Sequence, residues 1–185
     1  MPRAKFRQIA NGLFHSKLVY CLQVFGNVWG MATNDENVRR FTAFTKNDNR
    51  KLQVLQNQVL RMMTDLDPAT PTTTLLHQAK ALSVHQLTAF TTLTSVNRAI
   101  ATKTPEYFMR KFKIGNDSDD RIHPARQGNC LTVRADLTIT RGAYFYRAAS
   151  LWNMIPGNLK NGLPQTVFKK KVREWTKLNI AAKPP

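Results

Sequence analysis

The stretch SVHQLTAFTTLTSVNRAIAT, residues 83–102, decides the fold because it contains a long helical pattern with a clear start. Ser83 can accept a hydrogen bond from the first helical turn and is a typical N-cap residue. Apolar residues then recur every three or four positions, which is the spacing of one helix face. That face comprises Val84, Leu87, Phe90, Leu93, Val96 or Asn97, and Ile100. Thr91, Thr92 and Thr94 lower the helix propensity without breaking it, so a helix is predicted over 84–102.

The residues on both sides of this stretch show further helical patterns, bounded by capping residues and prolines. Asp48 fits the N-cap position of the preceding long helix, and Thr70 followed by Pro71 is typical of a helix start. Pro164 opens the last helix. Besides 84–102, we expect helices over residues 4–29, 49–64, 71–81, 143–154 and 165–179. The sequence therefore predicts a mainly α fold, a helical bundle with a basic C-terminal helix.

Apolar residues also define the inward faces expected for two of these helices. The face of the 49–64 helix comprises Leu52, Leu55, Val59, Met62 and Met63. The 165–179 helix is apolar at Phe168, Val172 and Trp175, with Lys and Arg around its other sides. At this spacing, core positions are the favoured interpretation for all three residues.

Three regions differ in composition along the chain. Residues 1–112 contain most of the predicted helices, with a loop over 31–47. Residues 113–129 are rich in Gly, Asn, Asp and Ser, so we expect a mobile loop there. Residues 130–185 are a basic C-terminal region that we expect to pack on the first region. Within it, partial alternation and β-branched residues favour one or two short strands near 130–140.

The charge balance gives the strongest physical indication of function. The chain has 28 Lys and Arg residues and 11 Asp and Glu residues, giving a net charge of +17 and a pI near 10.5. Residues 131–185 hold ten basic and two acidic residues, and thus +8 of this charge. So basic a chain repels itself when it folds, and polyanions relieve that repulsion. The imbalance is typical of a protein that binds nucleic acid.

The sequence lacks the motifs of several other classes. Cys21 and Cys130 are its two cysteines, too few for a disulfide-rich scaffold or for a zinc site on their own. No uninterrupted apolar run reaches about 18 residues, so we expect no membrane partner. No GxSxG, HExxH or phosphate-binding glycine loop occurs. We therefore expect a protein that is not an enzyme, with no catalytic residue, no metal and no cofactor.

The N-terminal segment allows more than one interpretation. The first 34 residues contain no acidic residue, and residues 18–30 are largely apolar after a basic start. This pattern resembles a signal peptide or a mitochondrial presequence. It is also the pattern of a buried first helix, which we favour. We accordingly expect a nuclear or cytoplasmic location, with a mitochondrial location as the alternative.

Basic residues are interleaved with aromatic residues in the C-terminal third, and both kinds can contact nucleic acid. Basic side chains bind phosphates, and aromatic side chains such as Tyr144, Tyr146 and Trp152 stack on bases when exposed. The candidate nucleic-acid-binding residues are Arg134, Arg141, Arg147, Lys160, Lys169, Lys170, Lys171 and Arg173. For Trp152, a core position is the favoured interpretation. For Lys169–Lys171, a solvated helix face and a phosphate contact are equally favoured.

Several segments, in this order, resemble the C-terminal region of non-LTR retrotransposon reverse transcriptases of the jockey and CR1 sort. The most specific are LQVLQNQVLRMM (52–63), which is similar to the family's "LqvlQNraLR" helix, and LWNMIP (151–156), which is similar to its "lWNxLP" signature. Further similarities lie in residues 16–30, 71–84, 105–108, 142–150 and from 168 onward. Together the resemblance covers about residues 12–180.

In that family, this region follows the catalytic palm domain, and its first part resembles the helical thumb that grips the template–product duplex. The resemblance implies that residues 1–112 are thumb-like. It also implies that catalysis belongs elsewhere, because the palm's Tyr-x-Asp-Asp turn is missing and Asp119–Asp120 lacks the tyrosine. The expected function is that of a non-catalytic fragment or remnant of an RNA-directed DNA polymerase that binds RNA or an RNA–DNA duplex.

The sequence departs from the family pattern at some positions, and other interpretations stay open. Met154 and Ile155 replace the usual residues before Pro156, and the stretch after residue 31 is longer than usual. The alternative is a co-opted structural or interaction protein whose basic helical surface docks on a protein partner or a large assembly, with residues 1–45 as part of the contact. An apolar face left exposed within residues 1–30 would favour that alternative. A transposon fragment without a selected role is a further possibility.

Overall fold

A computed structural model shows that the fold is mainly α-helical, as predicted. The structure describes residues 3–25, 45–106, 110, 112–114, 131–132, 144–160 and 162–180. In chain order its elements are α1 (Arg3–Ile9), the π-helix η1 (Ala10–His15), α2 (Ser16–Phe25), α3 (Lys46–Thr64), α4 (Thr72–Gln78), α5 (Val84–Thr102), β1 (Lys113–Ile114), β2 (Leu131–Thr132), α8 (Tyr144–Met154), α9 (Gly157–Lys160) and α10 (Gln165–Asn179).

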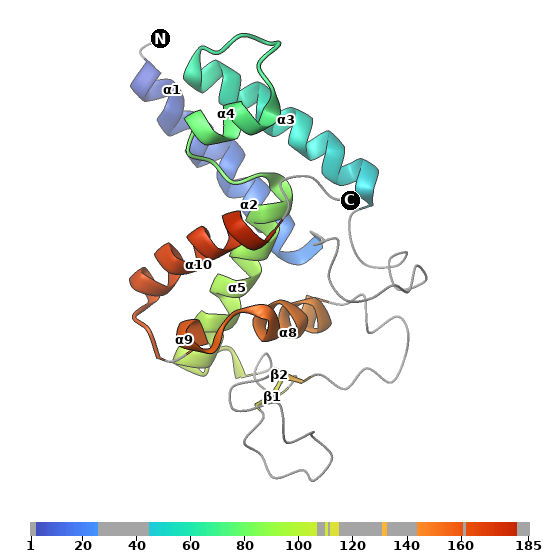
Figure 1. Cartoon of the computed structure of the whole chain (residues 1–185), viewed down its shortest axis with the longest axis vertical. Helices are drawn as coiled ribbons and strands as arrows, with labels where there is room; N and C mark the ends of the chain where they lie inside the picture. The colour runs from blue at the N-terminus through green and yellow to red at the C-terminus, as the bar shows by residue number, and fades with distance from the viewer. Residues whose placement is uncertain are drawn as a thin grey trace.

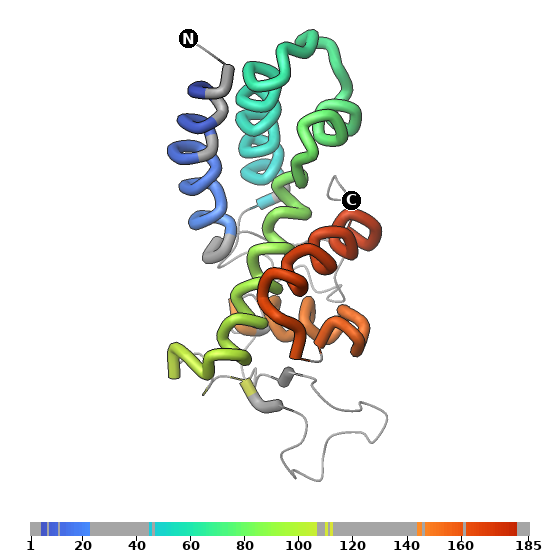
Figure 2. Tube along the Cα trace, turned by 90° about the vertical axis from the view of Figure 1, so that its left-hand side faces the viewer, coloured from blue at the N-terminus to red at the C-terminus, as the bar shows by residue number. Residues whose placement is uncertain are grey.

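The long helix α5 is central, and α2, α3, α8 and α10 pack along it (Figure 1). Its first half contacts α2 and α3, and α4 packs on α3. Its second half contacts α8, while α10 runs antiparallel along it, with Gln165 beside Asn97 and Ile180 beside Gln86. Figure 2 shows α1, η1 and α2 as one continuous rod beside α3. α5 therefore joins an N-terminal helical layer to the C-terminal helices.

The largest core cluster joins α5 to the C-terminal helices. Leu93 and Val96 of α5 are fully buried, as are Trp152 of α8 and Phe168 of α10. The rings of Trp152 and Phe168 lie 6.0 Å apart between centroids. Core positions are thereby confirmed for Phe168, Val172 and Trp152, and Trp152 is not exposed for stacking on a base.

α5 is buried on almost every side, not on one face only. The residues buried along it include His85, Gln86, Thr88, Thr91, Thr92 and Asn97 besides the apolar ones. Thr88 Oγ1 donates to the carbonyl oxygen of Val84 at 2.9 Å, and Thr91 Oγ1 donates to that of Leu87 at 2.9 Å. Because these hydroxyls bond to their own helix, they can be buried without a partner on a neighbouring helix.

The buried face of α3 differs from the predicted one. Leu55 is 48% exposed and Met62 is 65% exposed, so their predicted place on the inward face is wrong. The other predicted residues of that face, Leu52, Val59 and Met63, are half-buried. The residues that α3 buries are Asn49, Gln56, Asn57 and Leu60.

Amide side chains of α3 hold the connection between α4 and α5. Gln56 Nε2 donates to the carbonyl oxygen of Leu82 at 2.9 Å, and Gln53 Oε1 accepts from the backbone N–H of Val84 at 2.8 Å. These bonds satisfy backbone groups at the start of α5, which would otherwise be costly to bury. The apolar pattern misplaced the inward face of α3 because α3 packs on backbone N–H and carbonyl groups of this connection. Amide side chains can bond to such groups, and apolar side chains cannot.

The start of α5 agrees with the prediction, and the start of α3 does not. Ser83 is the N-cap of α5, and its hydroxyl accepts from the backbone N–H of Gln86 at 3.2 Å. In α3 the N-cap is Thr45, and Asp48 is the third residue of the helix. The two form a reciprocal capping box, with Asp48 Oδ2 accepting from the backbone N–H of Thr45 at 3.0 Å.

The short helix α4 also starts later than expected. Pro71 takes the N-cap position without a side-chain cap, so the predicted cap at Thr70 is wrong. The helix ends at Gln78, not at residue 81. Ala79 closes it with a backbone bond to the Leu75 carbonyl at 2.9 Å.

A two-stranded antiparallel ladder pairs Lys113 with Thr132 and Ile114 with Leu131. The loop predicted over 113–129 is therefore wrong for its first two residues, and the rest of it lies outside the described residues. Of the strands predicted near 130–140, β2 is observed, and the remaining residues lie outside the described part.

Near the N-terminus, the predicted helix over 4–29 is observed up to Phe25, with a π-helix in its middle. Residues 26–29 and 31–44 lie outside the described residues, and residues 46–47 belong to α3 instead of a loop. None of the described helices combines the length and apolar character that a membrane crossing requires.

Candidate nucleic-acid interface

Four of the candidate residues, Lys169, Lys170, Lys171 and Arg173, belong to α10, whose packing fixes the direction in which they point. Phe168 and Val172 are buried one turn apart and face α5, together with Thr176 in the following turn. Residues four apart lie on one side of a helix. The basic residues between these buried positions are therefore turned toward solvent, and all four are exposed.

The exposed basic residues of α10 fall on two different sides. Lys169, Arg173 and Lys177 follow one another at intervals of four, so they form a single stripe. Lys170 borders this stripe, seven positions before Lys177. Lys171 lies on the opposite flank. Its helical neighbours there are the exposed apolar residues Val167 and Leu178, at intervals of four and seven.

A hydrogen bond links Lys80 to this stripe. Arg173 Nη2 donates to the carbonyl oxygen of Lys80 at 2.6 Å. Lys80 follows α4 with a left-handed backbone (φ 51°), and its side chain is exposed. We call Lys80, Lys169, Lys170, Arg173 and Lys177 together the α10 basic surface.

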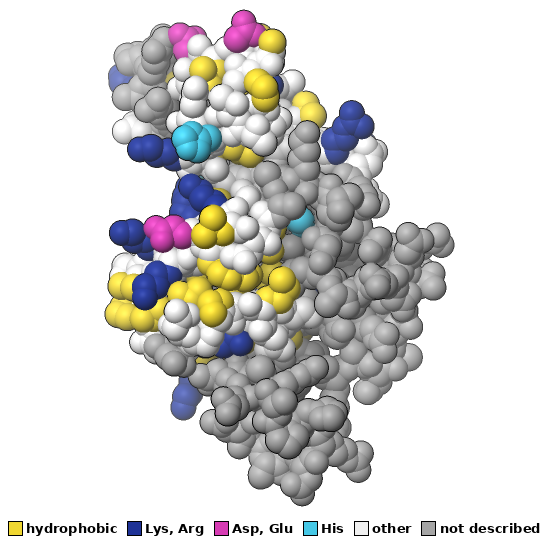
Figure 3. All heavy atoms as spheres, in the orientation of Figure 1, with side chains coloured by type: hydrophobic (Ala, Val, Ile, Leu, Met, Phe, Trp, Pro, Cys, Tyr) yellow, Lys and Arg dark blue, Asp and Glu magenta, His cyan; other side chains and the backbone are white. Residues whose placement is uncertain are grey.

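The α10 basic surface has little negative charge to offset it. Glu174 is the single acidic residue of α10. Within the described part of the chain, none of the five basic side chains is ion-paired. Figure 3 shows Lys and Arg side chains gathered over α10 at the left of the molecule. Clustered charge of one sign without partners produces a positive potential that attracts polyanions.

Two other candidates, Arg147 and Lys160, do not join this surface. Arg147 is half-buried on α8, where burial lowers the pKa of its guanidinium to about 10 although Tyr144 raises it. The group keeps its charge at neutral pH, but it lies partly inside the fold. Lys160 is half-buried at the end of α9. Arg134 and Arg141 lie outside the described residues.

Sequence reasoning left Lys177 and Lys80 out of the candidate set. Lys177 carried a usable signal, because it lies four positions after Arg173 and so continues the same stripe. Lys80 carried none, because its place beside α10 depends on a contact between residues 93 positions apart. Among the described residues, no three His, Cys, Asp or Glu side chains are placed to hold a metal ion.

Comparisons with known protein families, with curated proteins and with solved structures found no match to this chain. The resemblance to retrotransposon reverse transcriptases therefore stays a prediction. In this chain, the polar residues of its most specific segment, 52–63, have a structural role, because Gln53 and Gln56 bind the backbone before and at the start of α5.

Proposed function

We propose that this protein binds RNA or an RNA–DNA duplex without catalysing a reaction, and that the α10 basic surface contacts the phosphates. The observation that carries the proposal is the exposed stripe of Lys169, Arg173 and Lys177, bordered by Lys170 and Lys80. With a helical rise of about 1.5 Å per residue, the stripe spans about 12 Å. Phosphates follow one another along a strand at about 3.4 Å of axial rise, so the stripe spans several of them.

Contacts of this kind neutralise phosphates without reading base sequence. Each contact releases counterions, so the logarithm of the binding constant falls with the logarithm of the salt concentration, with a slope of about −0.7 to −0.9 per contact. With four or five contacts, we expect a slope of about −3 to −4.5. The affinity should depend little on sequence.

Fluorescence polarisation with labelled RNA, DNA and RNA–DNA duplexes between about 50 and 300 mM salt tests this proposal. The informative variant is Lys169→Gln with Lys177→Gln, which removes two charges from the stripe. The matched control is Lys51→Gln with Lys171→Gln, which removes two exposed charges elsewhere. The stripe variant should make the slope about 1.5 to 2 less negative, and the control should change it by less than about 0.5. Equal effects of the two variants would show that only net charge matters.

A second candidate function, docking on a protein partner, is favoured by a different observation. Ile9, Leu13 and Tyr20 of the N-terminal rod are 47%, 63% and 71% exposed. The exposed residues Lys5 and Lys17 accompany these apolar residues, and the segment contains no acidic residue. Such a surface is complementary to an amphipathic partner helix whose polar residues are acidic. On this alternative, the rod is the docking site for such a helix.

The alternative is tested with a synthetic helix that carries Leu on one face and Glu on the other. Leu13→Asp with Tyr20→Asp should abolish its binding and leave RNA binding intact. If the Lys169→Gln, Lys177→Gln variant weakens binding of the synthetic helix as strongly, the attraction is due to the overall charge of the protein and the rod is not a docking site.

A further inference from the structure

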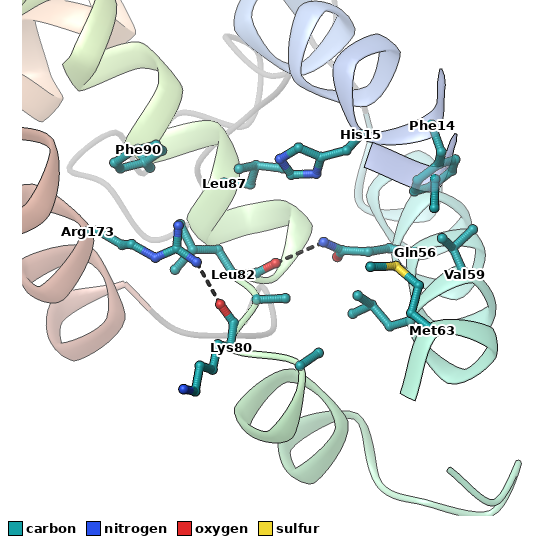
Figure 4. Close-up of a pocket in the computed structure, with 14 residues that line it drawn as sticks. Phe14, His15, Gln56, Val59, Met63, Lys80, Leu82, Leu87, Phe90 and Arg173 are labelled. Atoms are coloured by element: carbon teal, nitrogen blue, oxygen red, sulfur yellow. Dashed lines mark hydrogen bonds between the residues drawn. The ribbon is translucent and has the colours of Figure 1, made fainter. Parts of the chain in front are cut away.

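A cavity of about 310 Å³ opens between the N-terminal rod, α3, the start of α5 and α10 (Figure 4). Its size lies at the lower end of the range of small-molecule sites. Most of its lining residues are apolar, including Phe14, Val59, Met63 and Phe90. The polar lining residues are His15, Gln56, Lys80 and Arg173, and none of the lining residues that the structure describes is acidic.

Arg173 is held at one wall of this cavity by a defined contact. Its Nη2 donates to the Lys80 carbonyl oxygen at 2.6 Å, which leaves other N–H groups of the guanidinium for a ligand. On the opposite side, Gln56 is fixed by its bond to the carbonyl oxygen of Leu82. Figure 4 shows the side chains of Arg173 and His15 pointing toward one another across Leu87. The guanidinium of Arg173 on α10 and the imidazole of His15 on η1 therefore converge on the cavity from different elements.

The electrostatics of this pair favour an anion. Burial lowers the pKa of His15, and the charge of Arg173 lowers it further. Because the described lining holds no acidic residue, none of its side chains compensates the positive potential at this wall. A bound carboxylate or phosphate would compensate it and would accept hydrogen bonds from both side chains.

The local backbone at the cavity is irregular. The π-helix η1 supplies Ala10, Phe14 and His15 to the lining. π-helical turns are rare and are found frequently at functional sites, because they change the direction of side chains relative to an α-helix. Gly12 lies within η1, and its carbonyl accepts a hydrogen bond from Ser16 Oγ.

We propose that this cavity binds an organic anion, with a carboxylate or phosphate group between Arg173 and His15 and an apolar body against Phe14, Val59 and Met63. This site does not depend on nucleic-acid binding, although Arg173 belongs to both the α10 basic surface and the cavity lining.

Titration of the full-length protein with three probes tests the chemistry without any substitution. Octanoate carries both the anionic group and the apolar body, 1-octanol carries only the body, and inorganic phosphate carries only the anion. Octanoate should bind at least about tenfold more tightly than either of the other probes. The difference from 1-octanol measures the charge-assisted contact, and the difference from phosphate measures the burial of the apolar body. It should also raise the pKa of His15 in NMR titrations. Equal binding of octanoate and octanol, or of octanoate and phosphate, would overturn the proposal, as would the absence of octanoate binding.

Two substitutions on α3 locate the ligand. Val59→Phe fills the cavity from its wall and should abolish octanoate binding, whereas Val54→Phe, on the exposed side of α3, should leave it unchanged. If both bind octanoate as the parent does, the ligand lies elsewhere and the site is wrong.

The failure of this proposal can be told apart from that of nucleic-acid binding. Val59→Phe leaves every charge of the α10 basic surface in place, so RNA binding should persist when octanoate binding is lost. The Lys169→Gln, Lys177→Gln variant should show the reverse, since neither residue lines the cavity.

Discussion

Helices α3 and α5 are alike in their local chemistry and different in their surroundings. Each has 19 residues, begins with a capping box and ends at a residue with left-handed backbone, Asp65 in α3 and Lys103 in α5. Yet α5 is buried on almost all sides, whereas α3 leaves Leu55 and Met62 in solvent. The capping signals therefore set where each helix starts and ends, and the neighbouring elements decide what it buries.

The two helices also bury polar groups in different ways. In α5, the hydroxyls of Thr88 and Thr91 bond to carbonyls of their own helix. In α3, the amides of Gln53 and Gln56 bond to the backbone of another segment. The threonine hydroxyls of α5 are thus buried without a partner on a neighbouring helix, while the amides of α3 hold a neighbouring segment in place. Gln86 and Asn97 of α5 act as the α3 amides do, because they bond to Ile180 and Gln165 at the two ends of α10.

The largest expected effect comes from shortening one leucine in each helix. Leu93→Ala in α5 leaves a cavity in the main core and should lower the free energy of unfolding by about 3 kcal/mol. Leu55→Ala in α3 removes a side chain that is about half exposed, and should cost less than about 1 kcal/mol. Urea denaturation measures both. Similar losses of unfolding free energy in the two variants would show that Leu55 is covered in solution. The difference in burial between α3 and α5 would then be wrong.

An intermediate effect is expected from the amides. Gln56→Ala removes the donor to the carbonyl oxygen of Leu82 and should lower the free energy of unfolding by about 1 to 3 kcal/mol, since a buried carbonyl loses its partner. Gln58 is exposed on the same helix, so Gln58→Ala should stay within about 0.5 kcal/mol. An equal, small effect of the two variants in urea titrations would mean that water replaces the Gln56 amide as donor to the carbonyl oxygen of Leu82.

The fold class and the starts of α5 and α10 could be predicted from the sequence because they depend on neighbouring residues. Ser83 and Pro164 mark these two starts at positions that the structure confirms, whereas the predicted caps of α3 and α4 are wrong. The face of α3 could not be predicted, since it depends on Leu82, which lies 26 positions from Gln56. The candidate site was partly predictable for the same reason. Spacing along α10 identifies its stripe, but nothing local places Lys80 beside it.

The two capping boxes should differ modestly in strength. Ser83→Ala in α5 should cost about 1 to 2 kcal/mol, because Ser83 is buried and the N–H of Gln86 would lose its acceptor away from water. Thr45→Ala in α3 should cost about 0.5 to 1 kcal/mol, because water can reach that helix end. Thermal unfolding of the two variants would measure the difference. A larger loss for Thr45→Ala would contradict the burial that distinguishes the helices.

The smallest effect is a pH dependence at His15, where residues from both α3 and α5 line the cavity. Burial and the charge of Arg173 lower the pKa of His15 in the folded protein. The unfolded chain therefore binds a proton more readily. The stability from neutral His15 is complete above about pH 6.5 and is lost as the pH falls from there through the lower pKa of the folded state. His15→Gln should flatten this part of the stability profile. Because the imidazole is partly exposed, solvent screening keeps the effect small. Unchanged acid sensitivity in His15→Gln would place the titrating group elsewhere.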